Sequence, residues 1–128
     1  MATVLIIGAG GVGGVVTYKC VQNRDVFTKI VLASRRLESC EKIQKQLPDG
    51  AIEVERVDAD NTEETADLIR KTGADIVVNV ALPYQDLTIM DACIATNTPY
   101  LDTANYEHPD EAKFEYKEQW AKDDAFRK

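Results

Sequence analysis

The sequence is poor in the residues that crosslink small domains or build metal sites. It has three cysteines (Cys20, Cys40 and Cys93), widely spaced along the chain, and one histidine among 128 residues. Disulfide frameworks and structural metal sites need closely spaced pairs of such residues, so neither is expected. We expect free thiols in a reducing compartment, the cytoplasm.

Positive charge and long apolar runs are also scarce. Lysine and arginine total 15 against 22 aspartates and glutamates, a net charge of −7. This balance argues against broad binding to a phosphate backbone, and we expect no nucleic-acid partner. No apolar run approaches the roughly 20 residues of a membrane span, and no basic leader precedes the first run. We therefore expect neither a membrane partner nor a signal peptide.

What the sequence does contain is an alternation of apolar runs and helical patterns typical of one globular domain, residues 1–128. Continuous apolar, β-branched runs predict strands buried on both faces, and the alternating run at 52–57 predicts a strand near a sheet edge. The expected strands are 4–7, 30–33, 52–57, 76–80 and, more weakly, 99–101.

Helical periodicity fills the gaps between these strands. The first expected helix should face inward with Val12, Val15, Val16 and Cys20. The second should face inward with Leu37, Cys40, Ile43 and Leu47. A helix over about 84–94 should face inward with Leu87, Met90 and Ile94. The helix after residue 60 has the clearest ends, with Asn61 as N-cap, Glu64 three residues later, and Lys71 and Gly73 at its end. Strands and helices in this order predict an α/β fold, a Rossmann-type doubly wound parallel sheet.

A glycine-rich loop joins the first strand to the first helix. Gly8, Gly10 and Gly13 follow the Gly-x-Gly-x-x-Gly pattern, which permits a tight turn, close approach of a pyrophosphate, and close packing of helix on strand, respectively. The backbone N–H groups at the helix start, around Gly11 and Val12, favour phosphate. The loop could instead be a simple connection. Gly8, Gly11 and Gly14 also fit the spacing of short-chain dehydrogenases, which likewise predicts a dinucleotide.

The end of the second strand indicates which dinucleotide is bound. NAD-binding domains place a carboxylate about 20 residues after the glycines to bind the ribose 2′-OH. Here the strand ends in Ser34, Arg35 and Arg36. Ser34 can hydrogen-bond a 2′-phosphate and Arg35 can pair with it, which predicts NADP(H). The alternative is a solvated arginine pair, and Arg36 fits that description better than Arg35.

Two further strand ends supply candidate cofactor contacts. Asp58 follows the third strand, with Ala59 beside it. Asp58 is expected either to contact the adenine or to cap the next helix, and Asp60 could take either role instead. The fourth strand ends at Asn79 and continues through Ala81, Leu82 and Pro83. The backbone here should line the nicotinamide-side ribose and phosphates. The Asn79 side chain could instead only fix this loop by internal hydrogen bonds.

Weaker candidates follow the fifth strand. Asp102, Thr103 and Tyr106 are placed either to flank the nicotinamide or to form an Asx-type turn. His108 is expected at the surface. Tyr116 and Trp120, four residues apart on an expected helix, should pack on the sheet or on another domain.

Taken together, these segments resemble the N-terminal cofactor domain of the saccharopine dehydrogenase family, especially its carboxynorspermidine (carboxyspermidine) synthase branch. The resemblance covers essentially the whole chain and is carried by residues 4–13, 33–36, 78–84 and 100–107. It implies an NADPH-dependent oxidoreductase that reduces an imine formed from small-molecule amine and aldehyde substrates. Family members are longer and have a substrate and dimerisation domain.

The resemblance further implies that this chain is an N-terminal fragment of a longer, homodimeric enzyme of polyamine biosynthesis, and it names no catalytic residue. Two other functions fit the same pattern: a non-catalytic NADP sensor and a short-chain dehydrogenase. The Tyr-x-x-x-Lys pair of the latter would normally lie beyond Lys128.

Overall fold

The computed structural model describes residues 2–82, 85–103 and 117–127. The elements are β1 (Ala2–Ile7), α1 (Gly11–Val21), β2 (Phe27–Ser34), α2 (Leu37–Lys45), β3 (Glu53–Arg56), α3 (Thr62–Thr72), β4 (Ile76–Asn79), α4 (Asp86–Ala95), β5 (Tyr100–Asp102), α5 (Lys117–Trp120) and α6 (Asp123–Phe126). All strand pairs are parallel, in the order β3-β2-β1-β4-β5. The expected α/β Rossmann-type sheet is confirmed, with the alternating strand β3 at an edge.

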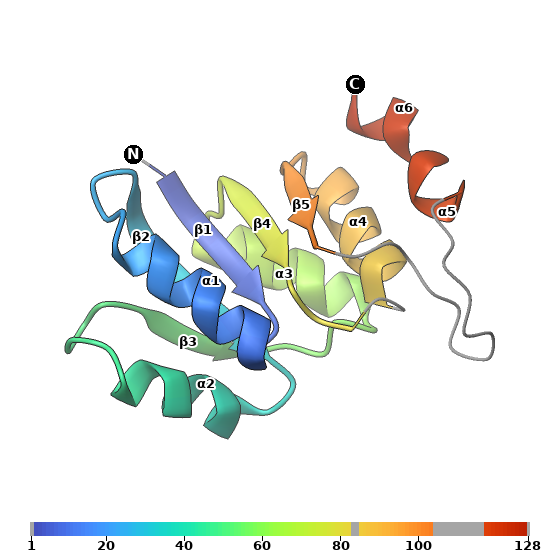
Figure 1. Ribbon diagram of the computed structural model, residues 1–128. Helices are drawn as coiled ribbons and strands as arrows, with labels where there is room; N and C mark the ends of the chain where they lie inside the picture. The colour runs from blue at the N-terminus through green and yellow to red at the C-terminus, as the bar shows by residue number, and fades with distance from the viewer. Residues whose placement is uncertain (1, 83–84, 104–116, 128) are drawn as a thin grey trace.

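Two apolar cores sandwich this sheet. In Figure 1, α1 and α2 lie in front of the sheet, and α3 and α4 lie behind it. Side chains of β1 alternate between the two cores: Val4 and Ile6 join the α1/α2 side, while Leu5 and Ile7 join the α3/α4 side. All four are fully buried or nearly so. The continuous apolar sequence of β1 therefore reflects a central strand covered on both faces.

Helix α1 buries only part of the face that its sequence predicts: Cys20 lies in the core and Val16 packs against it. Val12 and Val15 are 55% and 61% exposed, whereas Gly13, Thr17 and Cys20 are buried. The reason is steric: Gly13 packs so closely against the glycine loop that its position determines which side of the helix faces the sheet. Thr17 is tolerated in the core because its hydroxyl donates to the Gly13 carbonyl, 2.7 Å away.

The other helices agree more closely with their sequence patterns. Helix α3 begins after Asn61, whose side chain accepts from the Glu64 N–H, and ends at Gly73 in the left-handed conformation, both as predicted. Helix α4 begins at Asp86, later than expected. Met90 is buried as predicted, but Leu87 and Ile94 are only partly buried, and Ile89 and Cys93 are the more deeply buried residues.

The C-terminal helices α5 and α6 lie beside α4 and β5. Phe126 stacks on Tyr100, with ring centroids 6.1 Å apart. Trp120 is 72% exposed, so it does not pack on the sheet, and the alternative that it packs on another domain stays a prediction. The expected helix partner of Trp120, Tyr116, lies outside the described residues, as do Tyr106 and His108.

Candidate functional site

The glycine loop between β1 and α1 is shaped by two close backbone approaches. Gly8 has φ +119°, and a Cβ there would lie 2.7 Å from the backbone carbonyl of Val80. A Cβ on Gly13 would lie 2.0 Å from the Gly8 carbonyl oxygen. These contacts confirm the tight turn at Gly8 and the close packing at Gly13. Gly10 differs, because a Cβ there would meet nothing within 4 Å.

The open space beside Gly10 adjoins the N-terminus of α1. Gly10 is the N-cap, no side chain caps the helix, and its first turn carries no acidic residue. The backbone N–H groups of Gly11, Val12 and Gly13 lie in the first turn, where they have no acceptor within the helix. The helix dipole adds partial positive charge there. An anion such as a pyrophosphate fits this end of the helix in both charge and space.

A cleft of about 390 Å³ runs along the carboxyl ends of the strands and contains this loop. We call it the cofactor cleft. Its lining is Ile7, Gly8, Ala9, Gly10, Ser34, Arg35, Arg36, Ser39, Val57, Ala59, Val80, Ala81, Leu82 and Gln85. Open α/β sheets bind ligands at this end, where the connections from neighbouring strands diverge. Of the cofactor-binding residues that the sequence singled out, the cleft brings together Gly8, Gly10, Ser34, Arg35, Ala59, Ala81 and Leu82. Its lining does not include Gly11, Val12, Gly13, Asp58 or Asn79.

At the end of β2, the cleft is lined by Ser34, Arg35 and Arg36. Both arginines are exposed, so their guanidinium groups are available to an anion. The Ser34 hydroxyl donates to the Arg36 carbonyl at 2.8 Å and accepts from the Arg36 N–H at 3.2 Å. Ser34 therefore shapes the turn that presents the arginines, and its hydroxyl must rotate to donate to a phosphate.

Ala59 lines the cleft, whereas the Asp58 carboxylate forms a hydrogen bond with the backbone two residues later. Its Oδ1 accepts from the Asp60 N–H at 3.1 Å. The helix-capping role considered for Asp58 belongs to Asn61 instead. Contact between Asp58 and the adenine stays a prediction.

The connection from β4 to α4 forms the wall of the cleft opposite β2. Ala81 and Leu82 line it, and Pro83 lies outside the described residues. Asn79, at the end of β4, is only 2% exposed. Its Oδ1 accepts from the Ala81 N–H at 2.9 Å, so the side chain does fix this loop internally. Contact of the neighbouring backbone with the cofactor stays a prediction.

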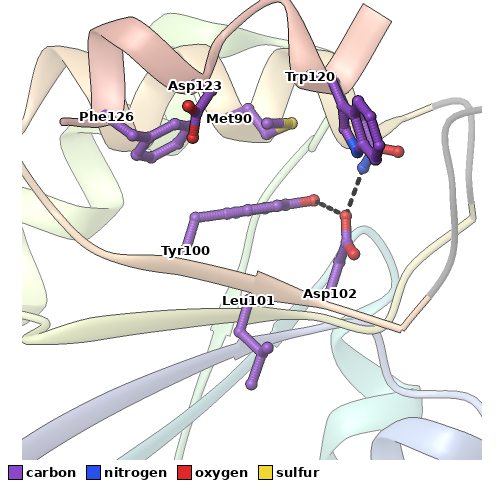
Figure 2. Close-up of a pocket in the computed structure, with 8 residues that line it drawn as sticks. Met90, Tyr100, Leu101, Asp102, Trp120, Asp123 and Phe126 are labelled. Atoms are coloured by element: carbon purple, nitrogen blue, oxygen red, sulfur yellow. Dashed lines mark hydrogen bonds between the residues drawn. The ribbon is translucent and has the colours of Figure 1, made fainter. Parts of the chain in front are cut away.

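Asn79 also belongs to a closed ring of hydrogen-bonded side chains from four elements, the Asn79 ring. Its Nδ2 donates to Asp86 Oδ1 at 2.7 Å and to the Tyr100 hydroxyl at 3.0 Å. That hydroxyl donates to Asp102 Oδ2 at 2.7 Å, as Figure 2 shows. Gln119 Nε2 closes the ring by donating to Asp102 Oδ2 at 2.6 Å and to Asp86 Oδ2 at 3.3 Å.

Burial of this ring changes the acidity of its members. Desolvation raises the pKa of Asp86 to about 7, and the nearby Asp102 carboxylate adds to the rise, while the hydrogen bond from Asn79 opposes it. Burial also raises the pKa of Tyr100 well above its usual value. Tyr100 is therefore a neutral donor at any physiological pH.

Sequence reasoning did not single out two polar residues that line the cleft. Ser39, in the first turn of α2, and Gln85, at the start of α4, both line the cofactor cleft. Their only sequence signal is that each closely follows a strand end. Asp102 is the last residue of β5 and points into the Asn79 ring, while Thr103 is exposed. A contact of Asp102, Thr103 or Tyr106 with ligand stays a prediction.

Known proteins similar to this chain agree with the geometry. The family model for the saccharopine dehydrogenase NADP-binding domain matches residues 4–128. A carboxyaminopropylagmatine dehydrogenase from Synechocystis sp. is 50% identical over 127 residues, which is 99% of this chain and 32% of that protein. A carboxynorspermidine synthase from Vibrio cholerae is 40% identical over 80% of this chain and 27% of its own length. The chain thus spans about a third or less of these relatives.

Solved structures share the fold at low sequence identity. Saccharopine dehydrogenase (L-Glu forming) from Saccharomyces cerevisiae superposes with a TM-score of 0.70 at 20% identity, over 85% of this chain and 23% of that one. A dTDP-glucose 4,6-dehydratase from Bacillus anthracis, in complex with NAD, gives 0.71 at 11% identity over 99% of this chain and 51% of its own. In the described part of this chain, no helix has the length and apolar character needed to cross a membrane.

Proposed function

The chain belongs to the saccharopine dehydrogenase NADP-binding domain family, and on that premise we propose that it is the NADPH-binding domain of an oxidoreductase that reduces an imine formed from an amine and an aldehyde. One observation carries the cofactor role: the space beside Gly10 is open and adjoins the start of α1, which no side chain caps. Both lie in the cleft at the carboxyl ends of the strands. The names of the relatives, a carboxyaminopropylagmatine dehydrogenase and carboxynorspermidine synthases, support the reaction class.

In this proposal each strand end binds a different part of the cofactor. The backbone from Gly8 to Gly13 holds the pyrophosphate. Arg35 pairs with the 2′-phosphate, and Ser34 orients the turn that carries it. Asp58 and Ala59 border the adenine, and the backbone from Asn79 to Leu82 lines the nicotinamide half.

The reaction adds a hydride and a proton across a C=N bond. An amine and an aldehyde first lose water to form the imine, and NADPH supplies the hydride when bound. The proton reaches the nitrogen and leaves a secondary amine. In this proposal the chain positions the cofactor, and the residues that bind the substrates lie in a further domain. The length of the relatives, about three times that of this chain, supports this division.

The preference for NADPH over NADH tests the cofactor assignment. A charge-assisted hydrogen bond to a 2′-phosphate contributes about 1.5–3 kcal/mol, or about 10- to 150-fold in affinity. Calorimetric titration should show that preference in the unmodified chain, and Arg35→Ala should reduce it while leaving NADH binding nearly unchanged. Arg70→Ala, which removes an exposed arginine paired with Asp67 on α3, is the matched control. Equal affinities for the two cofactors in the unmodified chain would refute the assignment.

The imine chemistry is tested by NADPH oxidation. Hydride transfer needs the imine carbon about 3–3.5 Å from the nicotinamide, and this positioning supplies much of the rate. The isolated 128 residues should bind NADPH but not oxidise it above the uncatalysed rate with aspartate semialdehyde and a diamine such as diaminopropane or putrescine. A protein of the relatives' length that carries this domain should oxidise NADPH only when both substrates are present. Oxidation with the aldehyde alone would instead indicate a carbonyl reductase.

A further inference from the structure

The Asn79 ring lies directly behind the wall of the cofactor cleft. Tyr100, Asp102 and Gln119 do not line the cleft, yet they are linked to it through the Asn79 amide. The ring uses both N–H groups of that amide, toward Asp86 and Tyr100. Only the amide oxygen faces away from the ring, and it accepts from the Ala81 N–H.

The loop that donates this hydrogen bond forms part of the cofactor cleft. Ala81 lines the cleft, and the preceding Val80 carbonyl is the group that leaves no room for a side chain at Gly8. The Val80 N–H also donates to the Ile7 carbonyl at 2.9 Å, at the end of β1. The position of the β4–α4 connection and the shape of the glycine loop therefore depend on each other.

Only an amide satisfies every partner at position 79. A carboxylate could accept from the Ala81 N–H but would face Asp86 as a like charge. An apolar side chain of the same size could neither donate to Asp86 and Tyr100 nor accept from Ala81, and polar groups buried without partners are costly. The ring therefore determines which way the amide points.

We propose that Asn79 is a positioning residue of the cofactor cleft: the ring formed by Asp86, Tyr100, Asp102 and Gln119 orients its amide, and the amide oxygen holds the Ala81 backbone in place for the nicotinamide half of NADPH. The inference rests on the proposed cofactor role of the cleft. A loop that is already ordered before binding loses less conformational entropy when NADPH binds, so the ring raises affinity without touching the ligand.

Tyr100→Phe is the sharpest test, because it removes one hydroxyl from the ring and leaves the aromatic contact with Phe126. The hydroxyl accepts from Asn79 and donates to Asp102, so the substitution removes two hydrogen bonds of the ring. The loss of the one that orients the Asn79 amide should weaken NADPH binding about three- to tenfold. Adenosine 2′,5′-bisphosphate, which lacks the nicotinamide half, should bind with unchanged affinity. Amide hydrogen exchange of Ala81, measured by NMR without ligand, should become faster. Tyr18→Phe, at an exposed tyrosine on α1, is the matched control and should change none of these quantities.

A second pair of variants tests the ring from its other side. Asp86→Ala removes one of the two acceptors of the Asn79 amide and should weaken NADPH binding as Tyr100→Phe does. Asp86→Asn keeps the oxygen that accepts from Asn79 and loses only the long contact from Gln119, so it should restore most of the affinity. Both variants should bind adenosine 2′,5′-bisphosphate like the unmodified chain.

The outcomes separate this inference from the proposed function. Unchanged NADPH affinity in Tyr100→Phe and Asp86→Ala, or an equal loss of affinity for NADPH and the bisphosphate, would overturn the positioning role alone. Failure of the unmodified chain to bind NADPH would overturn the proposed function and this inference with it. A loss confined to NADPH, with faster exchange at Ala81, supports the positioning role.

Discussion

At the scale of single residues, the glycines of the loop after β1 meet different physical demands. Gly8 needs the absence of a side chain because of its positive φ and the Val80 carbonyl, and Gly13 needs it because of the Gly8 carbonyl. Gly10 has φ −85°, which any residue adopts, and open space where a Cβ would be. Neither backbone conformation nor packing explains a glycine there, whereas the proposed close approach of a pyrophosphate would.

We therefore expect Gly10→Val to abolish NADPH binding while the fold is retained. The valine side chain would occupy the space that the pyrophosphate needs, and it would meet no protein atom within 4 Å at its Cβ. Circular dichroism checks the fold, and fluorescence titration checks binding. Gly14→Ala, whose Cβ would make an ordinary 3.8 Å contact with Ile43, is the control and should bind normally. If a folded Gly10→Val chain binds NADPH normally, then the glycine loop only connects β1 to α1 and does not bind the pyrophosphate.

At the scale of elements, sequence patterns were reliable where local chemistry decides the structure. The apolar runs predicted all five described strands, and Asn61 and Gly73 predicted the ends of α3, because a cap and a left-handed glycine act within one turn. The predicted inward face of α1 was right at Cys20 and Val16 and wrong at Val12 and Val15. Periodicity counts Val12 and Val15 as core residues, but Gly13, which has no side chain to count, sets the orientation of the helix.

The cap of α3 gives a prediction about stability. The Asn61 side chain accepts from the Glu64 N–H at 3.0 Å, and the Glu64 carboxylate accepts in turn from the Asp58 N–H at 3.1 Å. Asn61→Ala should lower the free energy of unfolding by about 1 kcal/mol. Asn61→Ser, which restores an acceptor, should recover most of that loss. Urea unfolding monitored by circular dichroism measures both, and equal losses in the two variants would show that the cap contributes nothing.

At the scale of the whole molecule, the Asn79 ring joins the carboxyl ends of β4 and β5 to α4 and α5. Its members were visible in the sequence as separate strand-end and helix residues, but their meeting depends on the packing of α5 against the sheet edge. No periodicity or spacing encodes that contact. The cleft could be predicted because it follows from the order of the strands, whereas the ring behind it required the tertiary structure.

Asp86 makes the stability of this arrangement depend on pH. In the unfolded chain its carboxyl group loses its proton near pH 3.8, whereas in the folded chain the pKa is about 7. Between these values the folded state binds the proton more tightly, so this group's contribution to stability is greatest below pH 3.8 and is lost as the pH rises to about 7. Asp86→Asn removes the titration. From pH 5.5 to pH 8, the free energy of unfolding of the variant should therefore rise by about 2 kcal/mol relative to that of the unmodified chain.

Urea unfolding at the two pH values measures this change, and Asp67→Asn serves as the control. Asp67 lies on α3 with a side chain that is 74% exposed, and it pairs with Arg70. Exposed ion pairs contribute little to stability, so this variant should differ from the unmodified chain by nearly the same small amount at both pH values. If Asp86→Asn behaves in the same way, then Asp86 is ionised throughout this range, and the ring holds a carboxylate whose desolvation is offset by the hydrogen bonds from Asn79 and Gln119.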